Sequence, residues 1–202
     1  MRISRAIRAA YLLLMLTTAA LPLAGCGVNN IPNYQEQAKA AWAQVLNQYQ
    51  RRADLVPNLV NIVKGAADFE RKTLEAVVEA RAKVGQTQLP PDILTNQQAM
   101  QQFAQNQAAL TSALSRLLVV VEQYPDLKAN ANFQTLQAQL EGTENRIAVA
   151  RRDYIDAVRS YNTELKTFPG RIWAMLLYSS YKEMAQFTAN EKVTTAPAVN
   201  FN

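Results

Sequence analysis

Apolar side chains recur every three or four residues along most of the chain after residue 34, the spacing that places them on one face of a helix. Gln, Ala, Glu, Lys and Leu dominate this stretch, and no segment alternates polar and apolar residues as a strand would. The pattern predicts an all-α protein. The two most regular apolar seams are Phe103, Gln107, Leu110, Leu114, Leu117, Val121 and Tyr124, and Phe133, Leu136, Leu140, Thr143, Ile147, Ala150, Tyr154, Ala157 and Tyr161.

Prolines, glycines and capping side chains divide this pattern into separate helices. We expect helices over residues 34–54, 57–84, 96–123 and 131–166, and a short helix over 171–185. Pro57 predicts the first break, because proline lacks a backbone donor and clashes with the preceding turn, and Asp54 is placed to cap the helix that follows. Seams that step by three and four predict helices packed at shallow angles, as in a bundle.

The first 25 residues have the pattern of an export signal. Arg2, Arg5 and Arg8 precede an uncharged, largely apolar run that ends in Leu-Ala-Gly-Cys at residues 23–26. This run is shorter than the ~20 residues that span a bilayer, which favours a cleaved signal over an uncleaved membrane anchor. The four residues resemble the lipobox of bacterial lipoproteins, and this resemblance implies that Cys26 becomes the acylated first residue. Two or three acyl chains give stable attachment.

The predicted organisation is therefore a signal peptide over 1–25, a lipidated tether over 26–33, a helical bundle over 34–190 and an extended tail over 191–202. Removing the signal changes the charge. Its three arginines leave 18 Lys+Arg against 16 Asp+Glu, a net charge of +2, which is no basis for nucleic-acid binding.

The residue types exclude several kinds of chemistry. The chain has no histidine and no cysteine besides Cys26, so Ser-His, Cys-His and histidine–metal sites are impossible, and no internal disulfide can form. The six glycines form no phosphate-binding loop, and no cofactor is expected. Two carboxylate pairs, Glu75–Glu79 and Glu141–Glu144, share the spacing of one helical turn, which is more typical of a solvated face than of an acid–base pair.

Several sequence runs carry a family resemblance. They include QRRADLVPNLV at residues 50–60, VVEQYPDLKAN at 120–130, TENRIA at 143–148, RRDY at 151–154 and VRSYN at 158–162. Together they resemble the LemA family of bacterial envelope proteins over most of residues 34–190. The resemblance implies an antiparallel, bromodomain-like four-helix bundle outside the cytoplasmic membrane, and no particular biochemical activity. The chain departs from many members at Ala66 and Phe69, where they have tyrosine and histidine, and in having a lipobox where they have a transmembrane helix.

The polar residues of these runs allow two interpretations. They could form a binding surface, or they could cap helices and pair across them to set the topology, which we favour because many lie beside Pro57 and Pro125. The candidate residues are Arg51, Arg52, Asp54, Pro57, Asn58, Glu122, Tyr124, Pro125, Asp126, Glu144, Arg146, Arg151 and Arg152. Trp173, Tyr178 and Tyr181 are candidates for either core packing or contact with a membrane interface or a partner.

These observations favour a non-enzymatic, lipid-anchored envelope protein that acts as an interaction or scaffold module for an envelope partner. We expect the domain to face the periplasm or exterior, and Gly27 after the lipidated cysteine favours the outer membrane if the organism has one. The alternatives are an enzyme, or an enzyme accessory, acting on envelope polymers through Asp and Glu residues, and a self-assembling homo-oligomer.

Overall fold

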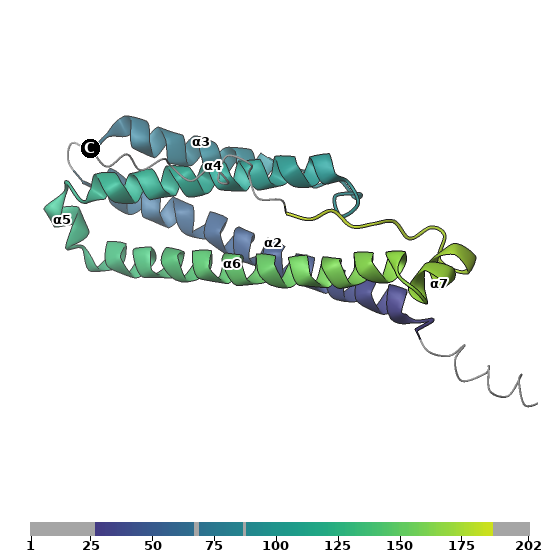
Figure 1. Cartoon of the computed structure of the whole chain (residues 1–202). Helices are drawn as coiled ribbons and strands as arrows, with labels where there is room; N and C mark the ends of the chain where they lie inside the picture. The colour runs from purple at the N-terminus through teal and green to yellow at the C-terminus, as the bar shows by residue number, and fades with distance from the viewer. Residues whose placement is uncertain (1–26, 67–68, 87, 188–202) are drawn as a thin grey trace, which may run out of the picture.

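The computed structural model describes residues 27–66, 69–86 and 88–187; the expected signal peptide, Cys26 and the predicted tail lie outside this part. The described residues form helices and no strand, which confirms the all-α prediction. Four long helices run up and down in antiparallel order (Figure 1). They are α2 (Asn30–Lys64), α3 (Arg71–Gln86), α4 (Gln97–Val121) and α6 (Ala131–Lys166), with the short α5 (Pro125–Lys128) before α6 and α7 (Gly170–Leu176) after it.

The predicted break at Pro57 is wrong. Helix α2 continues through this proline to Lys64, and Asp54 lies inside it as an acceptor for Gln50 Nε2 (2.8 Å) instead of capping a new helix. A proline inside a helix costs about 3 kcal/mol. Four aliphatic residues next to and after this proline are fully or almost fully buried, and each stabilises the fold by roughly 1.5–3 kcal/mol, so their burial outweighs the cost. They are Val56, Leu59, Val60 and Val63.

The start of α2 also differs from the prediction. Residues 30–33, expected as part of the tether, form the first turn of the helix. Ile31 is completely buried there, and Pro32 lies in the first turn, where a missing N–H has no cost. Of the described residues of the predicted tether, only 27–29 therefore precede the helix.

Side-chain caps begin α4 and α6 as expected. The Asn96 side chain accepts a hydrogen bond from the Ala99 amide (3.1 Å), and Asn130 accepts bonds from the amides of Asn132 (2.9 Å) and Phe133 (3.2 Å). The predicted helix over 171–185 is shorter, ending at Leu176, because the residues after it pack in extended form against the bundle.

This C-terminal segment (residues 178–187) takes the place of a fourth helix in one half of the bundle. Tyr154 donates a hydrogen bond to the Ala185 carbonyl (2.8 Å), and Asn162 bonds both the amide and the carbonyl of Met184. Phe187 packs against the rings of Trp42 and Tyr154. The short α3 covers only the half near α5, so the segment closes the core where α3 does not reach.

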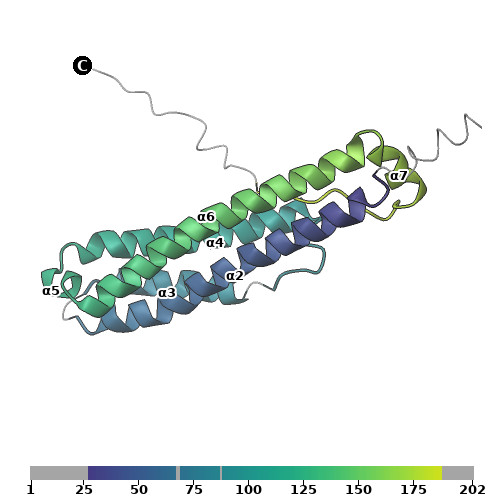
Figure 2. The same cartoon turned by 90° about the horizontal axis from the view of Figure 1, so that it is seen from below.

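The core consists of two hydrophobic clusters along the long axis. One, near α7, joins α2, α4, α6 and the C-terminal segment; the other, near α5, joins α2, α3, α4 and α6. Helices α2 and α6 lie side by side along the bundle, and α3 pairs with α4 (Figure 2). None of the described helices is long and apolar enough to cross a membrane.

Candidate functional site

A buried polar layer separates the two hydrophobic clusters. On α2, Arg52 lies between the last residue of one cluster and the first of the other, and Gln107 has the same place on α4. Thr143 and Glu144 occupy it on α6. Three helices therefore contribute polar side chains at one level of the bundle, where an apolar seam would otherwise be continuous.

Arg52 is the centre of this layer. Its side chain is 1% exposed, and its guanidinium bonds groups from two other helices. Nη1 donates to Thr111 Oγ1 (2.6 Å) and Glu144 Oε1 (2.9 Å), while Nη2 donates to both the side-chain and main-chain oxygens of Gln107. The guanidinium also lies 5.0 Å from the ring centre of Tyr49. Only its Nε–H has no partner among the described residues.

The hydrogen bonds of Arg52 chiefly fix the register of α2 against α4 and α6. A buried ion pair gains little net stability over a packed apolar layer, because both charges lose water. Its fixed donor geometry does penalise any sliding of α2 against α4 or α6, since a buried donor or acceptor would then lose its partner. Burial raises the pKa of Tyr49, and the nearby guanidinium groups of Arg151 and Arg52 oppose that rise, so this ring stays a neutral phenol. The contacts of Arg52 and Glu144 agree with the structural interpretation of these residues, which stays a prediction.

Apart from Arg151, which lies near Tyr49, the other residues singled out from the sequence do not gather at this layer. Tyr124 packs on Phe69 with ring centres 4.9 Å apart. Phe69 is one of the two positions where the chain departs from the family pattern, and its ring makes an aromatic contact there. Glu122 pairs with Lys128 at the exposed α4–α5 turn, and Arg151 lies over the Phe187 ring at 4.5 Å. The exposed remainder comprises Arg51, Asp54, Asn58, Pro125, Asp126, Arg146 and Arg152, with Pro57 half-buried.

Two of the exposed arginines flank a shallow groove between α2 and α6. Arg51 of α2 and Arg146 of α6 line it together with Thr135, Ala138 and Gln139, and Gly142 is part of its floor. A Cβ built on Gly142 would meet nothing within 4 Å, so close helix packing does not explain this glycine. Its effect is to leave the groove open. Within the described part of the chain, neither guanidinium has an ion-pair partner.

Of the two carboxylate pairs, Glu75 and Glu79 both line a pocket beside α3, whereas Glu141 and Glu144 turn to different partners. Glu79 also pairs with Lys83 (2.9 Å) on the exposed face of α3. Glu141 accepts a bond from Gln137 (3.0 Å), whereas Glu144 one turn later turns inward to Arg52. No cluster of three potential metal-binding side chains occurs within residues 27–66, 69–86 and 88–187.

Sequence reasoning missed the partners of Arg52. Gln107 and Thr143 were placed on apolar seams, and both are buried, but Thr111 was not singled out. The available signal was a polar residue at one seam position in each of two predicted helices. Recognising it required knowing the relative heights of the helices, which the sequence leaves free.

Comparison with known proteins decides the family. The profile of the LemA family matches residues 41–201, most of the chain. The chain belongs to the LemA family. Two proteins of Paramagnetospirillum magneticum, magnetosome proteins MamQ 1 and MamQ 2, are each 31% identical over 88 residues, 44% of this chain and 31% of theirs. Magnetosome protein MamQ of Magnetospirillum gryphiswaldense is 29% identical over 76 residues, 38% of this chain and 27% of its own length. The chain thus spans about a third of the relatives it matches.

Proposed function

We propose that this LemA protein is a lipid-anchored, non-enzymatic envelope protein whose bundle binds another envelope protein. LemA membership and the likeness to magnetosome proteins support a membrane-associated role. Lipid on Cys26 would attach the domain, facing the periplasm or exterior, and Gly27 after it favours the outer membrane where there is one. The proposal of a binding module rests on the α2–α6 groove.

The groove fits an acidic protein segment. Arg51 and Arg146 come from separate family-like runs, and the fold brings them to the same groove with exposed guanidinium groups. Guanidinium groups bind carboxylates with two parallel hydrogen bonds, and a pair on either side of a groove selects a chain carrying Asp or Glu. Gly142 lets a partner backbone approach the helix closely, because no side chain fills the floor.

In-cell photocrosslinking tests this proposal. A photoreactive residue at Ala138, in the groove, should give one reproducible adduct with an envelope protein, and the same residue at Ser115, on the exposed face of α4, should not. Arg51→Glu and Arg146→Glu should abolish the adduct by charge reversal. Arg152→Glu is the matched control, since this arginine is exposed on α6 but does not line the groove.

The alternatives give different results. Adducts of the chain only with itself would replace the adaptor role with self-assembly. Hydrolysis of an envelope polymer by the purified protein, with a bell-shaped pH–rate profile, would overturn the non-enzymatic assignment. Cys26→Ser should accumulate as an unprocessed precursor; a variant still cut after Gly25 and retained at the membrane would refute lipid anchoring.

A further inference from the structure

The short helix α7 and the residues beside it carry most of the large apolar side chains that the bundle leaves exposed. Of eight such side chains among the described residues, five lie within residues 168–177. Phe168 is 81% exposed, Met175 70% and Leu176 69%; Ile172 and Leu177 complete the cluster. Single exposed apolar residues need no explanation, but a contiguous group marks a surface that contacts something apolar.

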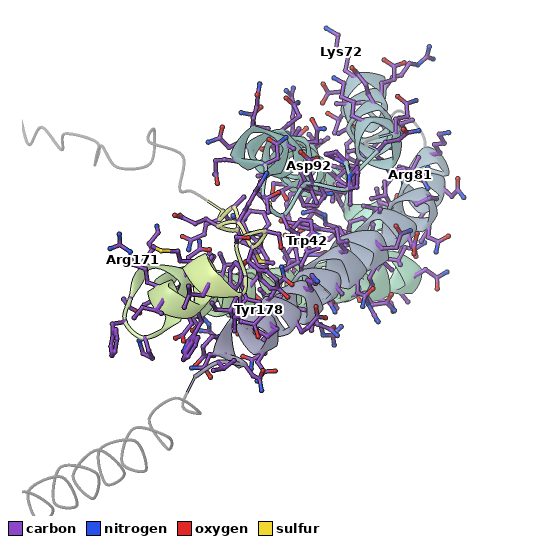
Figure 3. The ribbon with its side chains drawn as sticks, turned by 90° about the vertical axis from the view of Figure 1, so that its right-hand side faces the viewer. Trp42, Lys72, Arg81, Asp92, Arg171 and Tyr178 are labelled. Carbon is purple, nitrogen blue, oxygen red and sulfur yellow. The ribbon has the colours of Figure 1, made fainter. Side chains whose placement is uncertain are left out.

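Three of these side chains share one face of α7: Ile172, Met175 and Leu176 have the i, i+3, i+4 spacing that aligns residues on a helix. Phe168 and Leu177 flank the helix at its two ends. Trp173 and Ala174, on the other side, pack against the hydrophobic cluster at this end of the bundle. Helix α7 is therefore apolar on two faces. One packs against the core, and the other points away from it. Arg171 stands at the outer edge of the helix (Figure 3).

The fold fixes α7 beside the first described residue. A Cβ on Gly27 would lie 3.5 Å from the Pro169 ring, so the two segments are in contact. Asn30 Nδ2 donates to Glu164 Oε1 (3.1 Å), which ties the start of α2 to the end of α6. Gly170 packs so tightly on the Glu164 carbonyl that an added Cβ would lie 2.2 Å from it. Helix α7 and Gly27 thus lie together at one end of the bundle (Figure 1).

We propose that the exposed face of α7 is a lipid-contacting surface, which seats this end of the bundle in the interface of the bilayer that holds the Cys26 acyl chains. The inference rests on the proposed lipidation. Consecutive Cα atoms lie ~3.8 Å apart, so chains on Cys26 would leave the protein beside α7. Phe, Leu, Ile and Met with a flanking arginine suit the headgroup–acyl boundary, where apolar burial and attraction to anionic lipids act together.

Seating α7 would set the orientation of the whole domain. Helix α2 has 35 residues, so the α5 end would project on the order of 50 Å from the surface at 1.5 Å per residue. Arg51, 21 residues after Asn30, would hold the α2–α6 groove on the order of 30 Å out. A partner would then meet the groove at a fixed height, which a flexible tether alone does not provide.

Spin labelling of the full lipidated protein in phosphatidylethanolamine–phosphatidylglycerol vesicles tests the proposal. Acylation blocks Cys26, so Met175→Cys supplies a single labelling site, and Ala129→Cys beside α5 is the control at the far end. At Met175, collisions with oxygen should exceed those with a water-soluble nickel chelate, and at Ala129 the order should reverse. Replacing Phe168 and Leu176 by serine should lower the oxygen-to-nickel collision ratio at the Met175 label towards the ratio at the Ala129 label, because less apolar surface is left to hold α7 in the interface.

Each outcome decides between explanations. A label at Met175 that remains accessible to nickel in a protein shown by mass spectrometry to be acylated would overturn the α7 proposal and leave the lipid anchor intact. An unacylated protein would instead refute the proposed anchoring. A Met175 label shielded from both reagents, with dipolar coupling between labels, would overturn lipid contact in favour of a second copy on this face.

Discussion

Replacing Arg52 by methionine should destabilise the fold strongly without creating a large cavity. Methionine fills most of the space of the arginine stem but makes none of the four hydrogen bonds to Thr111, Glu144 and Gln107. Thr111 keeps a bond to the Gln107 carbonyl (3.2 Å), and Glu144, whose side chain is 37% exposed, can regain water. The buried Gln107 side chain cannot, so the loss should be about 3 kcal/mol.

Urea unfolding of the full protein in detergent, followed by circular dichroism, measures this change. A loss of this size lowers the melting temperature of a domain this large by about 10 °C. Arg51→Met is the matched control, because this neighbouring arginine is exposed and its replacement should change stability by less than about 0.5 kcal/mol. Arg52→Lys should fall between the two, since an ammonium cannot reproduce the planar set of donors.

A double-mutant cycle separates the ion pair from the rest of the layer. Glu144→Gln alone leaves the Arg52 charge buried without a counter-charge, whereas in the Arg52→Met background no buried charge remains. The second substitution should therefore cost much less in that background, with a coupling of about 1–3 kcal/mol. Additive effects, or an Arg52→Met protein as stable as Arg51→Met, would refute the register role of the polar layer.

Three further predictions follow from single contacts. Gly142→Ala should stabilise the domain by about 1 kcal/mol, because its Cβ enters open space. Gly170→Ala should destabilise it, because its Cβ would lie 2.2 Å from a carbonyl oxygen. Thermal melting of both variants tests this: a lower melting temperature for the first, or a higher one for the second, would contradict the prediction. Phe187→Ala should cost about 3 kcal/mol and shift the emission of Trp42 to longer wavelength, and an unchanged spectrum would mean that the C-terminal segment does not close the core. Burial raises the pKa of Tyr161 to about 12, so the unfolded state loses this proton first; stability should fall as the pH rises from 10 towards 12, and Tyr161→Phe should flatten that fall in urea titrations at each pH.

Local signals predicted most of the helical structure correctly. Asn96 and Asn130 begin their helices because a side-chain acceptor next to a helical run satisfies a free amide whatever the rest of the fold does. The same local reasoning failed at Pro57. Its cost is local, but the burial that outweighs it comes from packing against other helices. The extended C-terminal segment was missed for the same reason, since its hydrogen-bond partners lie on α6 and next to α4.

The sequence by itself determined the all-α class, the family and the seams that face the core, because periodicity, capping and motif content are written in consecutive residues. The tertiary structure decided which of two adjacent arginines is buried, and it brought Arg51 to one groove with Arg146. It also placed α7 beside Gly27. Each of these depends on the relative height and rotation of helices far apart in the chain, which are set by packing and by the match of buried donors to acceptors.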